Sequence, residues 1–169
     1  NSPILNKHFV SQIKVNIEKD GKIEIMNDGN GIDIAKHPDY DIWIPEMIFG
    51  HLRTSTNYKK NEKRIVGGKN GFGFKLVLIW SLYGRIETVD HIRGLKYVQE
   101  FKDNLNELCP PKITKVKSMK PYTKVTFIPD YKRFGIEGMT SDLESLLKKR
   151  VYDIAAVTDK QVKVFYNNI

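Results

Sequence analysis

Four glycines in seven residues, Gly67 to Gly73, stand directly before an apolar run from Phe74 to Leu82. Glycines allow several backbone N–H groups to converge on one anion, and a helix N-terminus adds the positive end of its dipole. The segment is therefore typical of a phosphate cradle that opens a helix. A purely structural turn is the alternative, and this segment alone does not decide between the two.

The spacing of the segment excludes the common glycine-rich nucleotide loops. A P-loop needs Gly followed at once by Lys and then Ser or Thr, whereas Phe74 separates Gly73 from Lys75. The dinucleotide fingerprint and the protein-kinase loop both need a third glycine where Leu76 stands. A phosphate site here must belong to another class of fold.

Strands and helices alternate along the chain. Alternating apolar residues predict half-buried strands, and apolar residues at helical spacing predict amphipathic helices. Gly84 is expected to end the helix that starts at Phe74, and Ser141 with Glu144 to cap the last helix as a capping box. Because the strands form antiparallel hairpins, the predicted class is α+β. The predicted strands are Gln12–Ile17, Ile23–Ile25, a hairpin of Ile86–Thr88 with Leu95–Phe101, Tyr122–Ile128 and Val162–Phe165; the predicted helices are Glu46–Leu52, Phe74–Leu82 and Ser141–Val157.

Charge and composition limit the classes of function. The chain has 169 residues, which fits a single domain, and no apolar run approaches the length of a membrane helix. The net charge of +8 favours a polyanionic partner. The basic residues gather at Lys59–Lys69, Lys112–Lys124 and Lys148–Arg150 without a zinc-finger or RNA-binding signature, so these clusters alone indicate a solvated face.

A second glycine-rich turn, Asn27 to Gly31, follows the first predicted hairpin. Two such turns, one ending a strand and one opening a helix, with a polar loop between them, resemble the Bergerat ATP-binding fold of the gyrase, Hsp90, histidine-kinase and MutL (GHKL) superfamily. The resemblance narrows to the eukaryotic-type type II DNA topoisomerases, including those of large DNA viruses. It is carried by Ile44–Leu52, Arg53–Tyr58, Val66–Leu76, Tyr122–Asp130 and Arg150–Ala155.

The resemblance implies a set of ATP contacts. Asn27 would face the adenine and accept from its amino group through the amide oxygen, while Gly31 leaves room for the base and Thr123 bonds near it. Apolar walls would come from Ile32, Ile48 and Phe49. The contacts to ribose and phosphates would be Ser55, Thr56, Asn57, Lys69, Asn70, Gly71, Phe72, Gly73 and Lys75.

Each of these roles has a structural alternative. Asn27 is also a common turn residue at a strand end, and Asp28 fits a turn former better than a ligand. Ile48 and Phe49 both suit the core side of an ordinary helix, and Thr123 suits any β-strand. The polar loop and Lys75 could simply be solvated.

The resemblance also implies what lies outside this sequence. The family's general-base Glu and its Mg²⁺-holding Asn belong to a helix before the first strand, so the general base is expected upstream of Asn1. A Lys of the following transducer domain would contact the γ-phosphate. We therefore expect residues 1–169 to form most of a single GHKL ATPase domain with no catalytic or metal-binding residue, and to show negligible ATP turnover. The cofactors implied are ATP and Mg²⁺.

The partners implied are double-stranded DNA and a second copy of the full-length protein, with no membrane. The location implied is the nucleus for a cellular protein, or the host cytoplasm or virion for a viral one, and not secretion. Two alternatives remain: another GHKL ATPase of the MutL or Hsp90 type, and a basic nucleic-acid-binding module without a nucleotide site.

Overall fold

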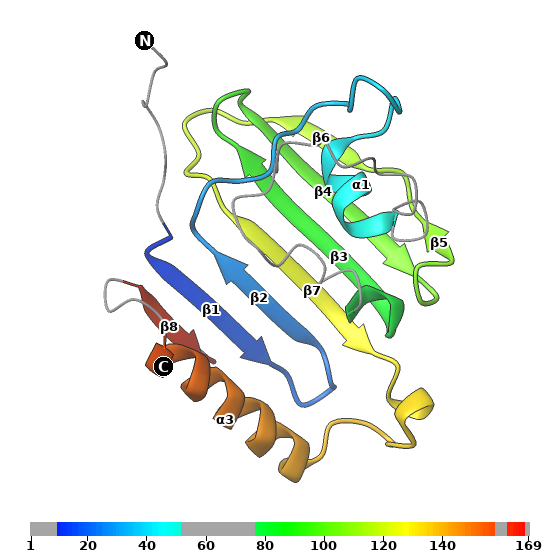
Figure 1. Cartoon of the computed structure of the whole chain (residues 1–169), viewed down its shortest axis with the longest axis vertical. Coiled ribbons are helices and arrows are strands. Elements are labelled where there is room, and N and C mark those ends of the chain that lie inside the picture. The colour runs from blue at the N-terminus through cyan, green and yellow to red at the C-terminus, as the bar shows by residue number, and fades with distance from the viewer. Residues whose placement is uncertain (1–9, 52–76, 158–161, 168–169) are drawn as a thin grey trace.

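A single mixed sheet dominates the fold (Figure 1). The computed structural model describes residues 10–51, 77–157 and 162–167. The elements of these segments are β1 (Gln12–Ile17), β2 (Ile23–Asn27), α1 (Ile44–Gly50), β3 (Ser81–Asp90), β4 (Leu95–Lys102), β5 (Glu107–Leu108), β6 (Lys112–Lys115), β7 (Thr123–Pro129), the 3₁₀ turn η2 (Tyr131–Phe134), α3 (Ser141–Val157) and β8 (Lys163–Tyr166). The predicted α+β class is confirmed, and no described helix is long and apolar enough to cross a membrane.

The strand order is β5-β4-β3-β7-β2-β1-β8, and β6 pairs with β4 beside β5. Neighbouring strands in the order are antiparallel except β1 and β8, which run parallel. The β1–β2 hairpin turns at Gly21, whose φ of 93° lies in the region that glycine adopts without steric cost. The β3–β4 hairpin turns at Gly94 in the same way, as the sequence predicted.

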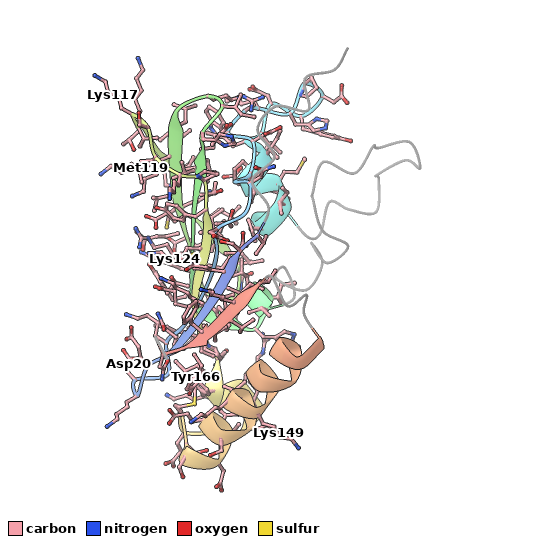
Figure 2. The ribbon with its side chains drawn as sticks, turned by 90° about the vertical axis from the view of Figure 1, so that its left-hand side faces the viewer. Asp20, Lys117, Met119, Lys124, Lys149 and Tyr166 are labelled. Atoms are coloured by element: carbon pink, nitrogen blue, oxygen red, sulfur yellow. The ribbon has the colours of Figure 1, made fainter. Side chains whose placement is uncertain are left out.

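The two faces of the sheet differ because side chains alternate along each strand. One face carries Ile25, Val125 and Ile86 side by side on β2, β7 and β3; Val125 and Ile86 belong to the hydrophobic core, and the partly buried Ile25 packs against it. Figure 2 shows α1 and α3 on this side of the sheet, so the described helices lie on one face. The other face carries Lys124 and its neighbours in the alternate register.

The expected helix stop at Gly84 is wrong, because Gly84 lies inside β3. The helical residues before it end at 79, and β3 begins at Ser81, so Leu82 is also a strand residue. A Cβ on Gly84 would lie 2.4 Å from Cδ2 of Leu78, a buried residue of that helix. The glycine therefore lets the helix pack closely on the strand instead of ending the helix.

The capping of α3 also differs from the prediction. The N–H of Leu143 donates to the Thr140 hydroxyl at 3.1 Å, so Thr140 is the N-cap in place of Ser141. The Glu144 carboxylate does not return to the helix start; it accepts from the Tyr166 hydroxyl at 3.3 Å and ties α3 to β8. The short strands β5 and β6 were not predicted, and the helix expected at Glu46 begins at Ile44, with Pro45 in its first turn.

Candidate functional site

Three polar side chains form a row across the helix side of the sheet. Asn27 ends β2, Thr123 begins β7, and the register places them opposite each other. Thr123 in turn lies opposite Thr88 of β3, and the two threonine hydroxyl oxygens are 3.0 Å apart. Three neighbouring strands therefore place polar side chains at one end of the sheet.

The segment that follows β2 is fastened to the same end of β3. The N–H of Ile32 donates to the Thr88 hydroxyl at 2.9 Å, and the N–H of Ile34 donates to the Asp90 carboxylate at 3.0 Å. These bonds cross from the second glycine-rich turn to the strand that carries Thr88. They hold the main chain of the turn beside the row of polar side chains.

Asp90 is the main anchor of this segment. Its carboxylate is buried and accepts from the N–H groups of Ile34, Ile92 and Arg93 and from the Arg93 guanidinium. Burial opposes ionisation, but the bonds from Ile34 and Arg93 outweigh it and lower the pKa of Asp90 below its ordinary value of 3.8. The carboxylate therefore stays charged and holds the turn at neutral pH.

Gly31 is required by packing against the backbone of β3. A Cβ at this position would lie 1.8 Å from the carbonyl oxygen of Val89, far inside van der Waals contact. From the sequence, Gly31 was explained by the room that it leaves for the adenine base. The structure gives a different reason, the close approach of Gly31 to the backbone of β3. A contact of Gly31 with a nucleotide stays a prediction.

Asn27 and Asp28 both make local hydrogen bonds. The amide oxygen of Asn27 accepts from the N–H of Gly29 at 3.2 Å, the turn role that was its structural alternative. A carbonyl oxygen has two lone pairs, so this bond leaves acceptor capacity on Asn27. Asp28 accepts from the N–H groups of Ser11 and Gln12 at 2.8 Å each, which fits its expected role as a turn former.

Of the three residues predicted to form apolar walls, one lies in the core and two are partly exposed. Phe49 is buried within the hydrophobic core, in agreement with its structural alternative. Ile32 and Ile48 are half-buried and pack against that core, so each keeps an exposed portion. The structure thus places Asn27, Gly31, Ile32 and Thr123 near one another around Thr88.

The remaining predicted contacts lie outside the described residues: Ser55, Thr56, Asn57, Lys69, Asn70, Gly71, Phe72, Gly73 and Lys75. Thr88, in contrast, is a site residue that the sequence-based prediction missed, because a threonine inside a strand looks like any β-branched strand residue. Its position opposite Thr123 is a signal that only the strand register reveals.

The general base and the Mg²⁺-holding residue were both expected upstream of Asn1. Asn1 also lies outside the described residues, so the position of a general-base Glu upstream of Asn1 stays a prediction. The described segments contain no group of three or more His, Cys, Asp and Glu side chains that could hold a metal ion. The catalytic and metal-binding assignments therefore stay predictions.

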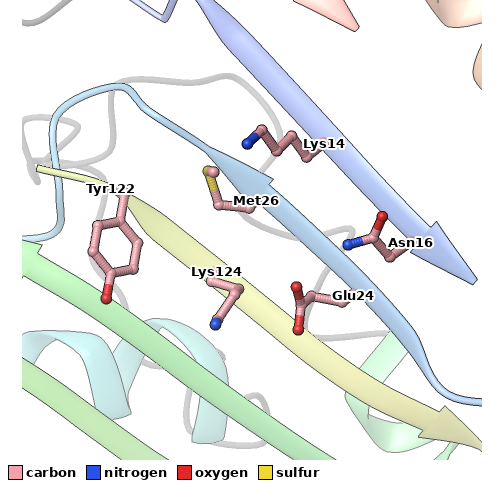
Figure 3. Close-up of a pocket in the computed structure, with 6 residues that line it drawn as sticks. All are labelled: Lys14, Asn16, Glu24, Met26, Tyr122 and Lys124. Atoms are coloured by element: carbon pink, nitrogen blue, oxygen red, sulfur yellow. The ribbon is translucent and has the colours of Figure 1, made fainter. Parts of the chain in front are cut away.

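A hollow of about 360 Å³ lies on the opposite face of the sheet (Figure 3). None of the predicted site residues lines it. Its lining residues are Lys14, Asn16, Glu24, Met26, Tyr122 and Lys124. The row around Thr88 is the better candidate, because it brings together Asn27 and Thr123, which the sequence singled out.

Comparison with known proteins gives the family. The chain is 50% identical over 157 residues to DNA topoisomerase 2 of Acanthamoeba polyphaga mimivirus, which covers 92% of this chain. Its structure matches the ATPase region of Saccharomyces cerevisiae topoisomerase II with a TM-score of 0.83 and 45% identity over 95% of this chain. The chain belongs to the ATPase domains of type II DNA topoisomerases. No family model matches it.

The topoisomerase ATPase domain is only part of those relatives. The chain spans 12% of the length of the mimivirus topoisomerase and 42% of the yeast ATPase-region structure. The 43K ATPase domain of Thermus thermophilus gyrase B, in a complex with an aminocoumarin, matches with a TM-score of 0.69 at 19% identity, which shows the shared fold. The shared fold is the GHKL fold, which was predicted from the resemblance of the two glycine-rich turns to that superfamily.

Proposed function

We propose that this topoisomerase ATPase domain binds ATP with the adenine against Asn27 and Thr123, while the buried Thr88 supports Thr123 and the N–H of Ile32 from behind. The observation that carries the proposal is the juxtaposition of the row around Thr88 with the turn that Asp90 and Thr88 hold in place. Among the described residues the Asn27 amide oxygen accepts one hydrogen bond, which leaves a lone pair for the exocyclic amino group, and the exposed portion of Ile32 offers an apolar contact to the base.

The phosphates would be bound by the glycine-rich segment Gly67–Gly73, through main-chain N–H groups, with Lys69 and Lys75 adding positive charge. Ser55, Thr56 and Asn57 would contact phosphate oxygens and the ribose. Mg²⁺ bound with the nucleotide would neutralise the triphosphate. In the full-length protein, ATP binding would bring two copies together as a gate that couples hydrolysis to the passage of one DNA duplex through another.

The adenine assignment is tested by comparing non-hydrolysable analogues of ATP and GTP in calorimetric titrations. Guanine carries a carbonyl oxygen where adenine carries its amino group, so the Asn27 oxygen favours ATP in the wild type. We expect Asn27→Ala to bind the ATP analogue about tenfold more weakly, a loss of about 1.4 kcal/mol in binding free energy. The variant should also lose the preference for the ATP analogue over the GTP analogue.

Gly71→Ala is the matched variant for the phosphates. It is expected to weaken both analogues by the same factor, because the phosphates are common to the two nucleotides. An Asn27→Ala protein that keeps the wild-type preference would overturn the adenine site, and a Gly71→Ala protein with unchanged affinity would overturn the phosphate cradle.

A further inference from the structure

The sheet has an uncovered face among the described residues. Both α1 and α3 lie on the core side, and Lys117, Met119 and Lys124 project from the opposite side in Figure 2. Antiparallel sheets commonly pack one face on the core and leave the other face in water. We refer to the side that carries Lys124 as the open face.

Cationic side chains outnumber carboxylates on the open face. The strand registers assign both sets, because residues paired across neighbouring strands share a face. The strands of the open face therefore carry a net positive charge. The cationic members are Lys14, Arg85, Lys96, Lys102, Lys112, Lys124 and Lys163; the acidic members are Glu24, Glu87, Glu100 and Glu107.

Glu87 shows how the positive charge is distributed. Its carboxylate is 7% exposed and lies 3.2 Å from the ammonium groups of Lys96 and Lys124 and 3.6 Å from the guanidinium of Arg85. One negative charge therefore faces three positive charges, so the cluster keeps a net positive charge toward solvent. Such a cluster attracts an anion that can replace water around the ammonium groups.

Three lysines of the open face share one cross-strand row with Met26, Glu87 and Val98. Lys14, Lys124 and Lys112 occupy one cross-strand row, which runs from β1 through β2, β7, β3 and β4 to β6. At roughly 4.8 Å per strand spacing the row is about 24 Å long. Lys117, just beyond β6, extends the basic surface on the same side (Figure 2).

We propose that the open face binds the phosphate backbone of duplex DNA. A row of about 24 Å matches roughly seven base pairs, since each strand carries one phosphate per 3.4 Å of helix axis. The choice of DNA over another polyanion rests on the proposed function of the full-length topoisomerase. Lysines that contact phosphates supply affinity and position without reading base sequence, so the surface binds any duplex sequence.

The test is fluorescence anisotropy of the chain with a labelled 20-base-pair duplex over a series of salt concentrations. The variant Lys112→Gln/Lys117→Gln removes two open-face charges that have no ion pair with another described residue. The matched control Lys132→Gln/Lys149→Gln removes two charges from η2 and α3, so both proteins have the same net charge.

We expect the open-face variant to lose at least about fivefold in affinity at low salt, and its log K against log salt slope to become shallower by about 2 units. The control keeps the wild-type slope. Equal losses in the two variants, no binding by the wild type in about 50 mM salt, or equally tight binding of a single strand would overturn the proposal. Binding of the ATP analogue, measured on the same proteins, stays unchanged, which separates this result from a failure of the nucleotide site.

Discussion

Thr88 and Thr123 face each other across neighbouring strands, with their hydroxyl oxygens 3.0 Å apart. The Thr88 hydroxyl also donates to the carbonyl oxygen of Tyr122 at 3.1 Å and accepts from the N–H of Ile32. A hydroxyl has one hydrogen and two lone pairs, so these three bonds use its full capacity when Thr123 donates. Thr88 is completely buried, and it joins the site strand, the neighbouring strand and the glycine-rich turn.

Replacing Thr88 with valine tests this junction, because valine keeps the shape and removes the hydroxyl. The Ile32 N–H would lose its acceptor in a buried place, which costs about 1–3 kcal/mol of the free energy of unfolding. Urea denaturation measures the change. Thr126→Val, on the open face, is the control, since its hydroxyl makes only a 3.5 Å contact with Glu24. Equal stability changes in the two variants would contradict the role of Thr88.

Gly31→Ala is expected to destabilise the chain by more than about 2 kcal/mol, because its Cβ would overlap the Val89 carbonyl oxygen and the backbone would have to move. Gly135→Ala provides the comparison. Gly135 has a φ of 72° and no atom within 4 Å of an added Cβ, so its replacement costs only the left-handed conformational preference, about 1–2 kcal/mol. Thermal unfolding of both variants measures the two losses of stability. A larger loss for Gly135→Ala than for Gly31→Ala would contradict the importance of the close approach at Gly31.

Acid should weaken the anchor at Asp90. Its pKa is lowered on folding, so the charged carboxylate stabilises the chain above pH 3.8, and this stability is lost as the pH falls through the lower pKa of the folded state. Asp90→Asn should cost about 1.5–3 kcal/mol at about pH 7, and the difference from wild type should shrink below pH 3.8. Urea unfolding at about pH 7 and about pH 3 measures it, with exposed Asp39→Asn as the control. A constant difference at both pH values would rule out this account.

The N-cap of α3 can be assigned by two single substitutions. Thr140→Ala removes the hydroxyl that accepts from Leu143 and should cost about 1 kcal/mol of stability. Ser141→Ala should change stability by less than about 0.5 kcal/mol, since alanine is a good helix former within the first turn. Circular dichroism during thermal unfolding separates the two, and a larger effect at Ser141 would restore the cap predicted from the sequence.

Periodicity predicted the sheet strands well because alternation reports which face is buried. The hairpins at Gly21 and Gly94 and the full extent of α3 were predicted from turn glycines and helical spacing. The cap of α3 was misplaced by one residue, since Thr140 and Ser141 both carry hydroxyls and only the backbone geometry distinguishes them. Gly84 was misinterpreted because a glycine at a helix end and a glycine under a packed helix look the same in sequence.

The candidate site was predicted in part. Motif resemblance selected Asn27 and Thr123, and the register places them opposite each other. Thr88 and Asp90 were missed because their roles depend on the main-chain N–H groups of a segment 56 residues earlier in the chain. The reason for a glycine at position 31 also lies in that long-range contact, so no local pattern could supply it.

The parallel pairing of β1 with β8 has a consequence for synthesis on the ribosome. Ile17 and Asn167 are joined by a hydrogen bond across a separation of 150 residues. At about 5–20 residues per second, β1 has emerged for roughly 8–30 s before its partner strand exists. During that interval one edge of β1 offers unpaired N–H and C=O groups to any neighbouring strand. The nascent chain is therefore open to mispairing along Gln12–Ile17, and a holding chaperone that covers this edge would protect it until β8 arrives.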